Sequence, residues 1–94
     1  MTRSPLREIA RIFARSQDEG LVAGFLRQLL TDDEVRAVAL RWRLVRMLHD
    51  RVPQREIARR LGVSLCKITR GSRELKRKDG AFRRVLEAEE NADG

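Results

Sequence analysis

The chain has 94 residues, 41% of them hydrophobic and 37% charged, which predicts one small globular domain with a modest core rather than a disordered chain. One Cys and one His exclude a disulfide within the chain and argue against a Cys/His metal site, and four aromatic residues argue against a stacking surface for single-stranded nucleic acid. The formal net charge is +7, and neither a membrane-spanning run nor a signal-peptide block is apparent, so we expect a cytoplasmic protein with no membrane attachment.

The first third of the chain predicts an apolar, electrically balanced pair of helices. We expect residues 1–5 to form a flexible arm, a first helix from Leu6 that ends near Gly20, and a second over residues 21–30. Gly24 marks either a helix start or a close helix approach. Residues 1–40 hold six basic and six acidic side chains. These two helices are predicted to form a core or a dimer interface, and together with the next helix we assign them to the dimerisation core helices over residues 6–49.

A third helix is predicted from Thr31 to about His49. Thr31 is a good N-cap, and Glu34 completes a capping box three residues later. Apolar residues cover most of the helix circumference, so we expect a central helix that is buried on more than one side, with Trp42 in the core. Arg41, Arg43 and Arg46 occupy the remaining face.

Residues 54–76 predict a helix-turn-helix. Ile57, Ala58 and Leu61 give the first helix an apolar stripe, and Gly62-Val63-Ser64 interrupts it. Gly62 suits the positive φ of a tight turn, and the Ser64 hydroxyl can cap the second helix. In this motif the second helix enters the DNA major groove. The alternative is an ordinary corner between two helices, with no DNA partner.

The positive charge is concentrated in and around this motif. Residues 41–60 hold seven basic and two acidic side chains, and residues 67–78 hold six basic and one acidic. This concentration favours a polyanion as partner, because phosphate contacts release counterions. A solvated basic face with no partner is the competing interpretation.

The chain ends in a last helix predicted over residues 81–90, striped by Phe82, Val85 and Leu86, and in a frayed acidic tail over residues 91–94. The whole sequence therefore predicts a single all-α domain of six helices over residues 1–94. No strand pattern, internal repeat, catalytic carboxylate pair or phosphate-binding glycine loop is apparent, so we expect no enzyme.

The sequence resembles the tryptophan-operon repressor family. The resemblance is tightest in QRE at 54–56, ITRGS at 68–72 and LK at 75–76, and it extends back to Leu30 and more loosely over most of the chain. It implies an intertwined all-helical homodimer that presents two helix-turn-helix reading heads to palindromic, double-stranded operator DNA. It also implies L-tryptophan as co-repressor, bound between the central helix and the reading head, with no other cofactor.

The resemblance carries over residue by residue to two sites. Arg41 and Arg70 would sandwich the indole, and Arg70 would also pair with the ligand carboxylate. The implied ligand residues are Leu30, Thr31, Arg41, Val45, Arg70, Gly71 and Glu74. The implied DNA residues are Gln54, Arg55, Ser64, Leu65, Cys66, Lys67, Thr69, Ser72 and Lys76, with Arg55 as the candidate for a bidentate guanine contact. Phosphate contacts by Arg41 and Arg70 are the alternative.

Three departures from the family pattern bear on effector and operator. Glu74 stands where the family commonly has a small hydroxyl residue near the ligand ammonium, so it either binds the ammonium or pairs with Arg70 and closes the site. The turn before Gln54 is one residue short and lacks the usual glycine, and residues 65–67 are larger than usual.

These observations favour a sequence-specific transcriptional repressor with tryptophan or a related indole as effector. Two rivals stay open. One is an effector-independent DNA-binding regulator on the same scaffold, which would differ in showing no ligand response. The other is a basic module that docks an acidic protein and would not discriminate between duplex sequences.

Overall fold

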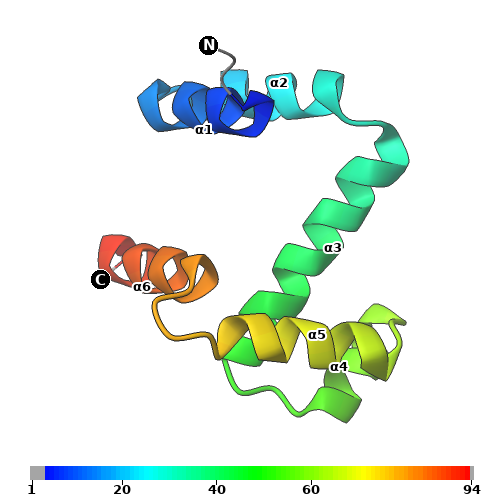
Figure 1. The fold of residues 1–94 in the computed structure, drawn as a ribbon. Helices are drawn as coiled ribbons and strands as arrows, with labels where there is room; N and C mark the ends of the chain where they lie inside the picture. The colour runs from blue at the N-terminus through cyan, green and yellow to red at the C-terminus, as the bar shows by residue number, and fades with distance from the viewer. Residues whose placement is uncertain (1–3, 94) are drawn as a thin grey trace. The chain divides into compact units, whose positions relative to one another are not determined.

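The computed structural model describes residues 4–93 and consists there of six helices with no strand, which confirms the all-α prediction (Figure 1). The predicted flexible arm lies mostly outside these residues. The helices are α1 (Pro5–Arg15), α2 (Glu19–Leu29), α3 (Asp32–His49), α4 (Gln54–Leu61), α5 (Leu65–Leu75) and α6 (Ala81–Asp93). The chain divides into two compact units, Met1–Arg36 and Ala37–Gly94.

The first unit contains α1, α2 and the first turn of α3. Pro5, which we assigned to the arm, begins α1, because a proline at the first helical position loses no hydrogen bond. The predicted stop at Gly20 was wrong. Helix α1 ends at Arg15, and the Asp18 side chain accepts a hydrogen bond from the Leu21 N–H at 3.0 Å. Asp18 therefore caps α2, and Gly20 lies within its first turn.

Helices α1 and α2 leave much apolar surface exposed. Phe13 and Phe25 meet edge to face with ring centroids 5.8 Å apart, yet neither helix contains a buried residue. Leu6, Leu21 and Leu29 are 74%, 65% and 51% exposed. The dimerisation core stays a prediction, and these side chains are the surface that such a core would cover.

Helix α3 begins as predicted. The Thr31 hydroxyl accepts from the Glu34 N–H at 3.1 Å, and the Glu34 carboxylate accepts from the Thr31 N–H at 2.8 Å. The hydrogen bond from the Thr31 N–H to the carboxylate is the main cause that lowers the pKa of Glu34. The prediction of burial on more than one side belongs to a dimer and stays a prediction, and α3 is buried less than that in the single chain. Only Leu44 and Val45 are buried, because the other helices of the second unit cover one stretch of α3 alone.

The core of the second unit draws on every helix in that unit. Its buried residues are Leu44 and Val45 of α3, Ile57 of α4, Ile68 of α5 and Leu86 of α6. Trp42 packs against this cluster, as expected for a core residue. Ile57 and Ile68 have no exposed surface, and each such burial contributes roughly 1.5–3 kcal/mol.

Helix α6 is longer than predicted. It continues through residues 91–93, which we expected to fray, and only Gly94 of that tail lies outside the described residues. The composition explains the extension, because Ala88, Glu89, Glu90 and Ala92 are good helix formers and no breaker precedes Gly94. Glu90 also contacts the His49 ring at the end of α3, which ties α6 to α3.

In the turn between α3 and α4, an arginine adopts the left-handed conformation that a glycine usually supplies. Arg51 has φ +64°, the left-handed region that glycine normally occupies. Its N–H donates to the Leu48 carbonyl, and the Val52 N–H donates to the Met47 carbonyl, both at 3.0 Å. This pair of bonds is a Schellman motif, which requires a left-handed residue at that position.

We predict that Arg51→Gly stabilises the protein. Glycine avoids the cost of roughly 1–2 kcal/mol that a residue with Cβ has in the left-handed conformation. Part of this gain is lost, because glycine also raises the conformational entropy of the unfolded chain. Urea denaturation should therefore show a free energy of unfolding about 0.5–1 kcal/mol higher than that of wild type. Arg51→Ala is the matched control, since it removes the same side chain but keeps Cβ. If both variants are equally stable, Arg51 carries no such strain.

Candidate functional site

Helices α4 and α5 pack against each other across a three-residue turn. Gly62 ends α4 with φ +64°, and its N–H donates to the Ala58 carbonyl at 2.9 Å. The Ser64 hydroxyl accepts from the Lys67 N–H at 3.4 Å and so caps α5. Both residues take the local roles predicted from the sequence. Ile57 and Ile68 lie buried in the core that the two helices share with α3 and α6.

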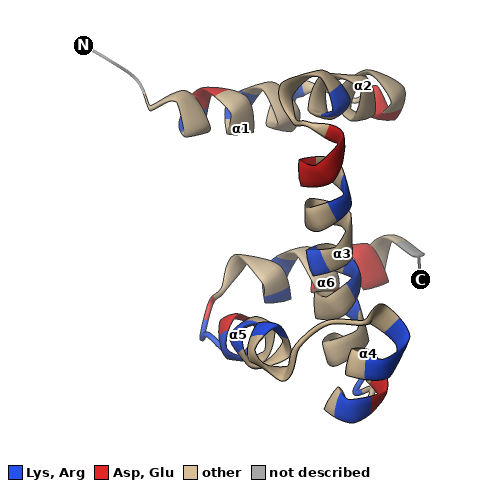
Figure 2. Ribbon diagram, turned by 90° about the vertical axis from the view of Figure 1, so that its right-hand side faces the viewer, with Lys and Arg blue, Asp and Glu red and all other residues tan. Residues whose placement is uncertain are grey.

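The outward faces of these helices carry the predicted DNA residues. Gln54 and Arg55 are exposed in the first turn of α4. The tip and face of α5 expose Ser64, Leu65, Cys66, Lys67, Thr69 and Lys76, whereas Ser72 is half-buried. The Thr69 hydroxyl already donates to the Leu65 carbonyl at 2.9 Å. Lys and Arg residues recur along the ribbon of α4 and α5, whereas the first turn of α3 is acidic (Figure 2). Whether these residues contact DNA stays a prediction.

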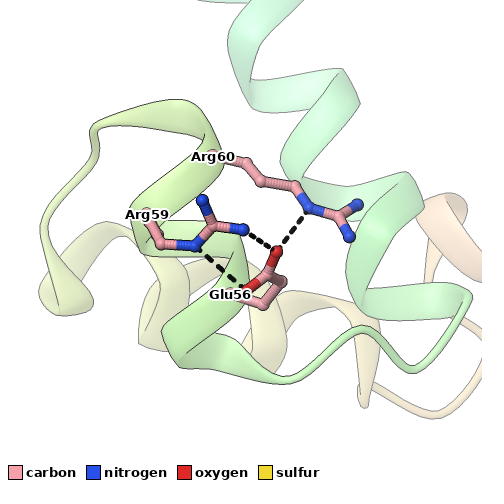
Figure 3. Close-up of polar contacts among 3 residues, drawn as sticks. All are labelled: Glu56, Arg59 and Arg60. Carbon is pink, nitrogen blue, oxygen red and sulfur yellow. Dashed lines mark hydrogen bonds and ion pairs between the residues drawn. The ribbon is translucent and has the colours of Figure 1, made fainter.

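Glu56 binds two arginines of α4 at once (Figure 3). Arg59 Nε donates to Glu56 Oε2 at 3.2 Å, and Arg60 Nε donates to Oε1 at 2.8 Å. Arg59 Nη2 also contacts Oε1. The hydrogen bonds from Arg59, and then those from Arg60, lower the pKa of the Glu56 carboxyl. Sequence analysis did not single out this cluster, although the i, i+3 and i, i+4 spacing indicates it.

A cavity of about 480 Å³ lies within the second unit, a volume in the range of small-molecule sites. It brings together five of the predicted ligand residues, which are Arg41, Val45, Arg70, Gly71 and Glu74. The lining residues that sequence analysis did not assign to the ligand site are Ala37, Leu40, Leu44, Val63, Lys67 and Phe82. Ala37 and Leu44 could have been found, because they lie four residues before and three residues after Arg41 on one helical face. Leu40 in turn lies three residues after Ala37 and four before Leu44.

The lining is an apolar pocket with charged groups set into it. Leu40, Leu44, Val45, Val63 and Phe82 form its apolar walls, and Arg41, Lys67, Arg70 and Glu74 supply its charges. The sequence left two roles open for Glu74, and one of them was an ion pair with Arg70. That ion pair is not formed among the described residues. Glu74 Oε2 instead accepts a hydrogen bond from Arg77 Nη1 at 3.1 Å, three residues further along the chain and after the end of α5.

Leu30 and Thr31 belong to the first unit and do not line this cavity. Leu30 follows α2 and is half-buried, and Thr31 is the exposed cap of α3. Their assignment to the ligand site stays a prediction.

Comparison with known proteins identifies the family. Residues 5–90 match the family described as Trp repressor protein. A Trp operon repressor homolog of Chlamydia trachomatis is 36% identical over 77 residues, covering 81% of this chain and 82% of the relative. Homologs of the same name from Actinobacillus succinogenes and Haemophilus influenzae are 51% and 46% identical over 65 and 66 residues, or 68% and 69% of this chain.

The chain belongs to the Trp repressor family, which confirms the resemblance found in the sequence. This is a family of transcriptional regulators and not a class of enzymes. The matches span 64% and 65% of the length of the Actinobacillus and Haemophilus relatives. No solved structure matches the chain.

Two features are absent from residues 4–93. No cluster of three or more His, Cys, Asp or Glu side chains in that range is arranged to hold a metal ion. None of the helices there is both long and apolar enough to cross a membrane.

We predict that Arg59 contributes more than Arg60 to the low pKa of Glu56. In an NMR titration of the Glu56 carboxyl, Arg59→Gln should raise the pKa more than Arg60→Gln does. The stabilisation from this pairing is present above the unfolded-state pKa of about 4.3 and is lost as the pH falls through the lower folded-state pKa. Equal or reversed shifts would refute the assignment.

Proposed function

We propose that this chain is a sequence-specific DNA-binding transcriptional repressor, which acts as a homodimer and takes L-tryptophan or a related indole as co-repressor. Membership of the Trp repressor family supports the class. One observation carries the mechanism: α5, the helix proposed to enter the major groove, also lines the cavity with Lys67, Arg70, Gly71 and Glu74. The ligand site and the DNA site therefore share a helix.

The DNA half of the proposal rests on α4 and α5 as a helix-turn-helix. The turn leaves the first residues of α5 exposed, and Arg55 is exposed in the first turn of α4. Most of the chain's net positive charge lies in and around these helices. That distribution suits a helix that sits in the groove while basic neighbours contact phosphates.

The ligand half rests on the chemistry of the cavity. Its leucine, valine and phenylalanine walls suit an apolar ring, and the guanidinium planes of Arg41 and Arg70 suit an indole sandwiched between cations. Arg70 is also suited to a ligand carboxylate, which it can bind through two parallel hydrogen bonds. A ligand that prefers the DNA-competent position of α5 shifts the population toward it and tightens DNA binding.

The two rival functions differ in what they predict. An effector-independent regulator would bind a preferred duplex equally well with and without ligand. A basic protein-docking module would lose affinity in salt as a DNA reader does, but would not distinguish one duplex sequence from another. The family and the cavity favour the ligand-responsive repressor over both.

Arg55→Ala tests direct sequence reading. The assay uses a duplex that wild-type protein enriches from a random pool, and compares it with a random duplex of equal length. We expect a loss of roughly 1–3 kcal/mol on the enriched duplex and little change on random DNA, because a bidentate guanine contact is sequence-specific. An equal loss on both duplexes would make Arg55 a phosphate contact.

Arg70→Ala tests the ligand site. Calorimetric titration with L-tryptophan should show affinity reduced about tenfold or more, because a charge-assisted contact to the ligand carboxylate is lost. Arg73→Ala is the matched control, since Arg73 is exposed on the same helix and does not line the cavity. Unchanged affinity in Arg70→Ala would remove this arginine from the ligand site.

A further inference from the structure

Glu56 is the acidic residue of α4, and it separates the exposed cations of the helix-turn-helix into two groups. Arg59 and Arg60 both contact its carboxylate, although their side chains are 71% and 55% exposed. Arg55 and Lys67, which belong to the predicted DNA residues, are also exposed, but within residues 4–93 they form no ion pair. Two cations of this motif are therefore neutralised by a carboxylate of the protein, and others are left for a partner.

Arg59 lies on the side of α4 that carries Arg55. The two residues are four positions apart, which places them on one helical face. Under the proposed function this face meets DNA, so Arg59 occupies a position from which an arginine can contact a phosphate beside the groove. Its guanidinium group is instead held by Glu56, together with that of Arg60 (Figure 3).

An ion pair within the protein lowers what an arginine contributes to DNA binding. A free cation gains from the counterions that a phosphate releases, whereas a paired cation must first leave its carboxylate. Ion pairs between exposed side chains are weak, so this restraint reduces phosphate contact and does not abolish it. Because phosphate contacts carry no sequence information, the reduction applies to every duplex.

We propose that Glu56 holds Arg59 and Arg60 away from DNA phosphates and so limits sequence-independent DNA binding. Glu56 is a positioning residue, because it acts through the two arginines and not on the DNA. The inference rests on the proposed DNA-binding function and is independent of the ligand site. It limits the share of the affinity that comes from phosphate contacts alone, which the base sequence does not control.

The test measures binding of the full chain to the random duplex by fluorescence anisotropy over a series of salt concentrations, without L-tryptophan. Glu56→Gln removes the charge and keeps the size of the side chain. We expect affinity about threefold to tenfold higher at about 0.1 M salt, and a dependence on salt steeper by about one for each bound chain, the effect of one added phosphate contact. The enriched duplex should gain by a similar factor, since phosphates are common to both.

A double-mutant cycle separates release of the two arginines from a general change in charge. Arg59→Gln and Arg60→Gln are introduced together, once in wild type and once in Glu56→Gln. The resulting loss of affinity for random duplex should be at least about threefold larger in Glu56→Gln, where the arginines are free to contact phosphates. Equal losses in the two backgrounds would overturn the restraint by Glu56. A merely structural role for Glu56 would change the free energy of unfolding and leave the salt dependence unchanged.

Asp79→Asn is the control for charge alone. It removes one negative charge from the exposed turn after α5, Asp79 forms no ion pair within residues 4–93, and asparagine tolerates its φ of +60°. This variant should keep nearly the salt dependence of wild type. A salt dependence as steep as that of Glu56→Gln would assign the effect to net charge and overturn the inference.

The outcomes distinguish this inference from the proposed function. If wild-type protein binds duplex DNA and Glu56→Gln binds it no more tightly, Glu56 imposes no restraint and the DNA-binding function stands. If wild-type protein binds no duplex, that function and the inference both fail. Far-UV circular dichroism checks that each variant is folded. The paired arginine substitutions also give a test that leaves Glu56 in place, since a loss of about tenfold or more in wild type would show that Arg59 and Arg60 already contact DNA.

Discussion

The packing of Leu44 of α3 against Gly71 of α5 is the contact that joins the core of the second unit to the cavity. A Cβ built on Gly71 would lie 2.6 Å from Leu44 Cδ2, closer than two carbon atoms can pack. The absence of a side chain at Gly71 therefore leaves room for the Leu44 side chain. Leu44 is buried in the core and also lines the cavity, so the same contact stabilises the fold and shapes the ligand site. A ligand that moves Leu44 or Arg70 acts directly on α5.

Helix α5 therefore contributes residues both to the exposed surface and to the cavity lining. Residues near its start, among them Leu65 and Cys66, are exposed, while Arg70, Gly71 and Glu74 line the cavity. Lys67 is both exposed and part of the lining. A short helix with few buried residues is easily shifted, and Ile68 is the one residue of α5 that is fully buried. Under the proposed function, a small change in the position of such a helix would couple ligand and DNA without a separate transmission pathway.

Local chemistry made much of the fold predictable from the sequence. The capping box of Thr31 and Glu34, the left-handed Gly62 and the Ser64 cap each depend on residues within a few positions of one another. The error at Gly20 arose where two local signals compete. Gly20 favoured a stop of the first helix, but Asp18 caps α2 and places Gly20 inside it. The left-handed conformation of Arg51 was not predicted, because its residue type disfavours it. The position of Phe82 in the cavity lining depends on tertiary packing, which the spacing of residues in the sequence does not fix. Glu74 has several cations within reach along the chain, and spacing alone does not decide that it pairs with Arg77.

Under the proposed function, a ligand in the cavity controls DNA binding by α5. Fluorescence anisotropy of wild-type protein on its enriched duplex, with and without saturating L-tryptophan, tests this control. We expect L-tryptophan to tighten binding to this duplex by at least about fivefold, the lower end of typical coupling between sites. The change on a random duplex should be much smaller. Equal affinity for the enriched duplex with and without L-tryptophan would show that the ligand does not control DNA binding.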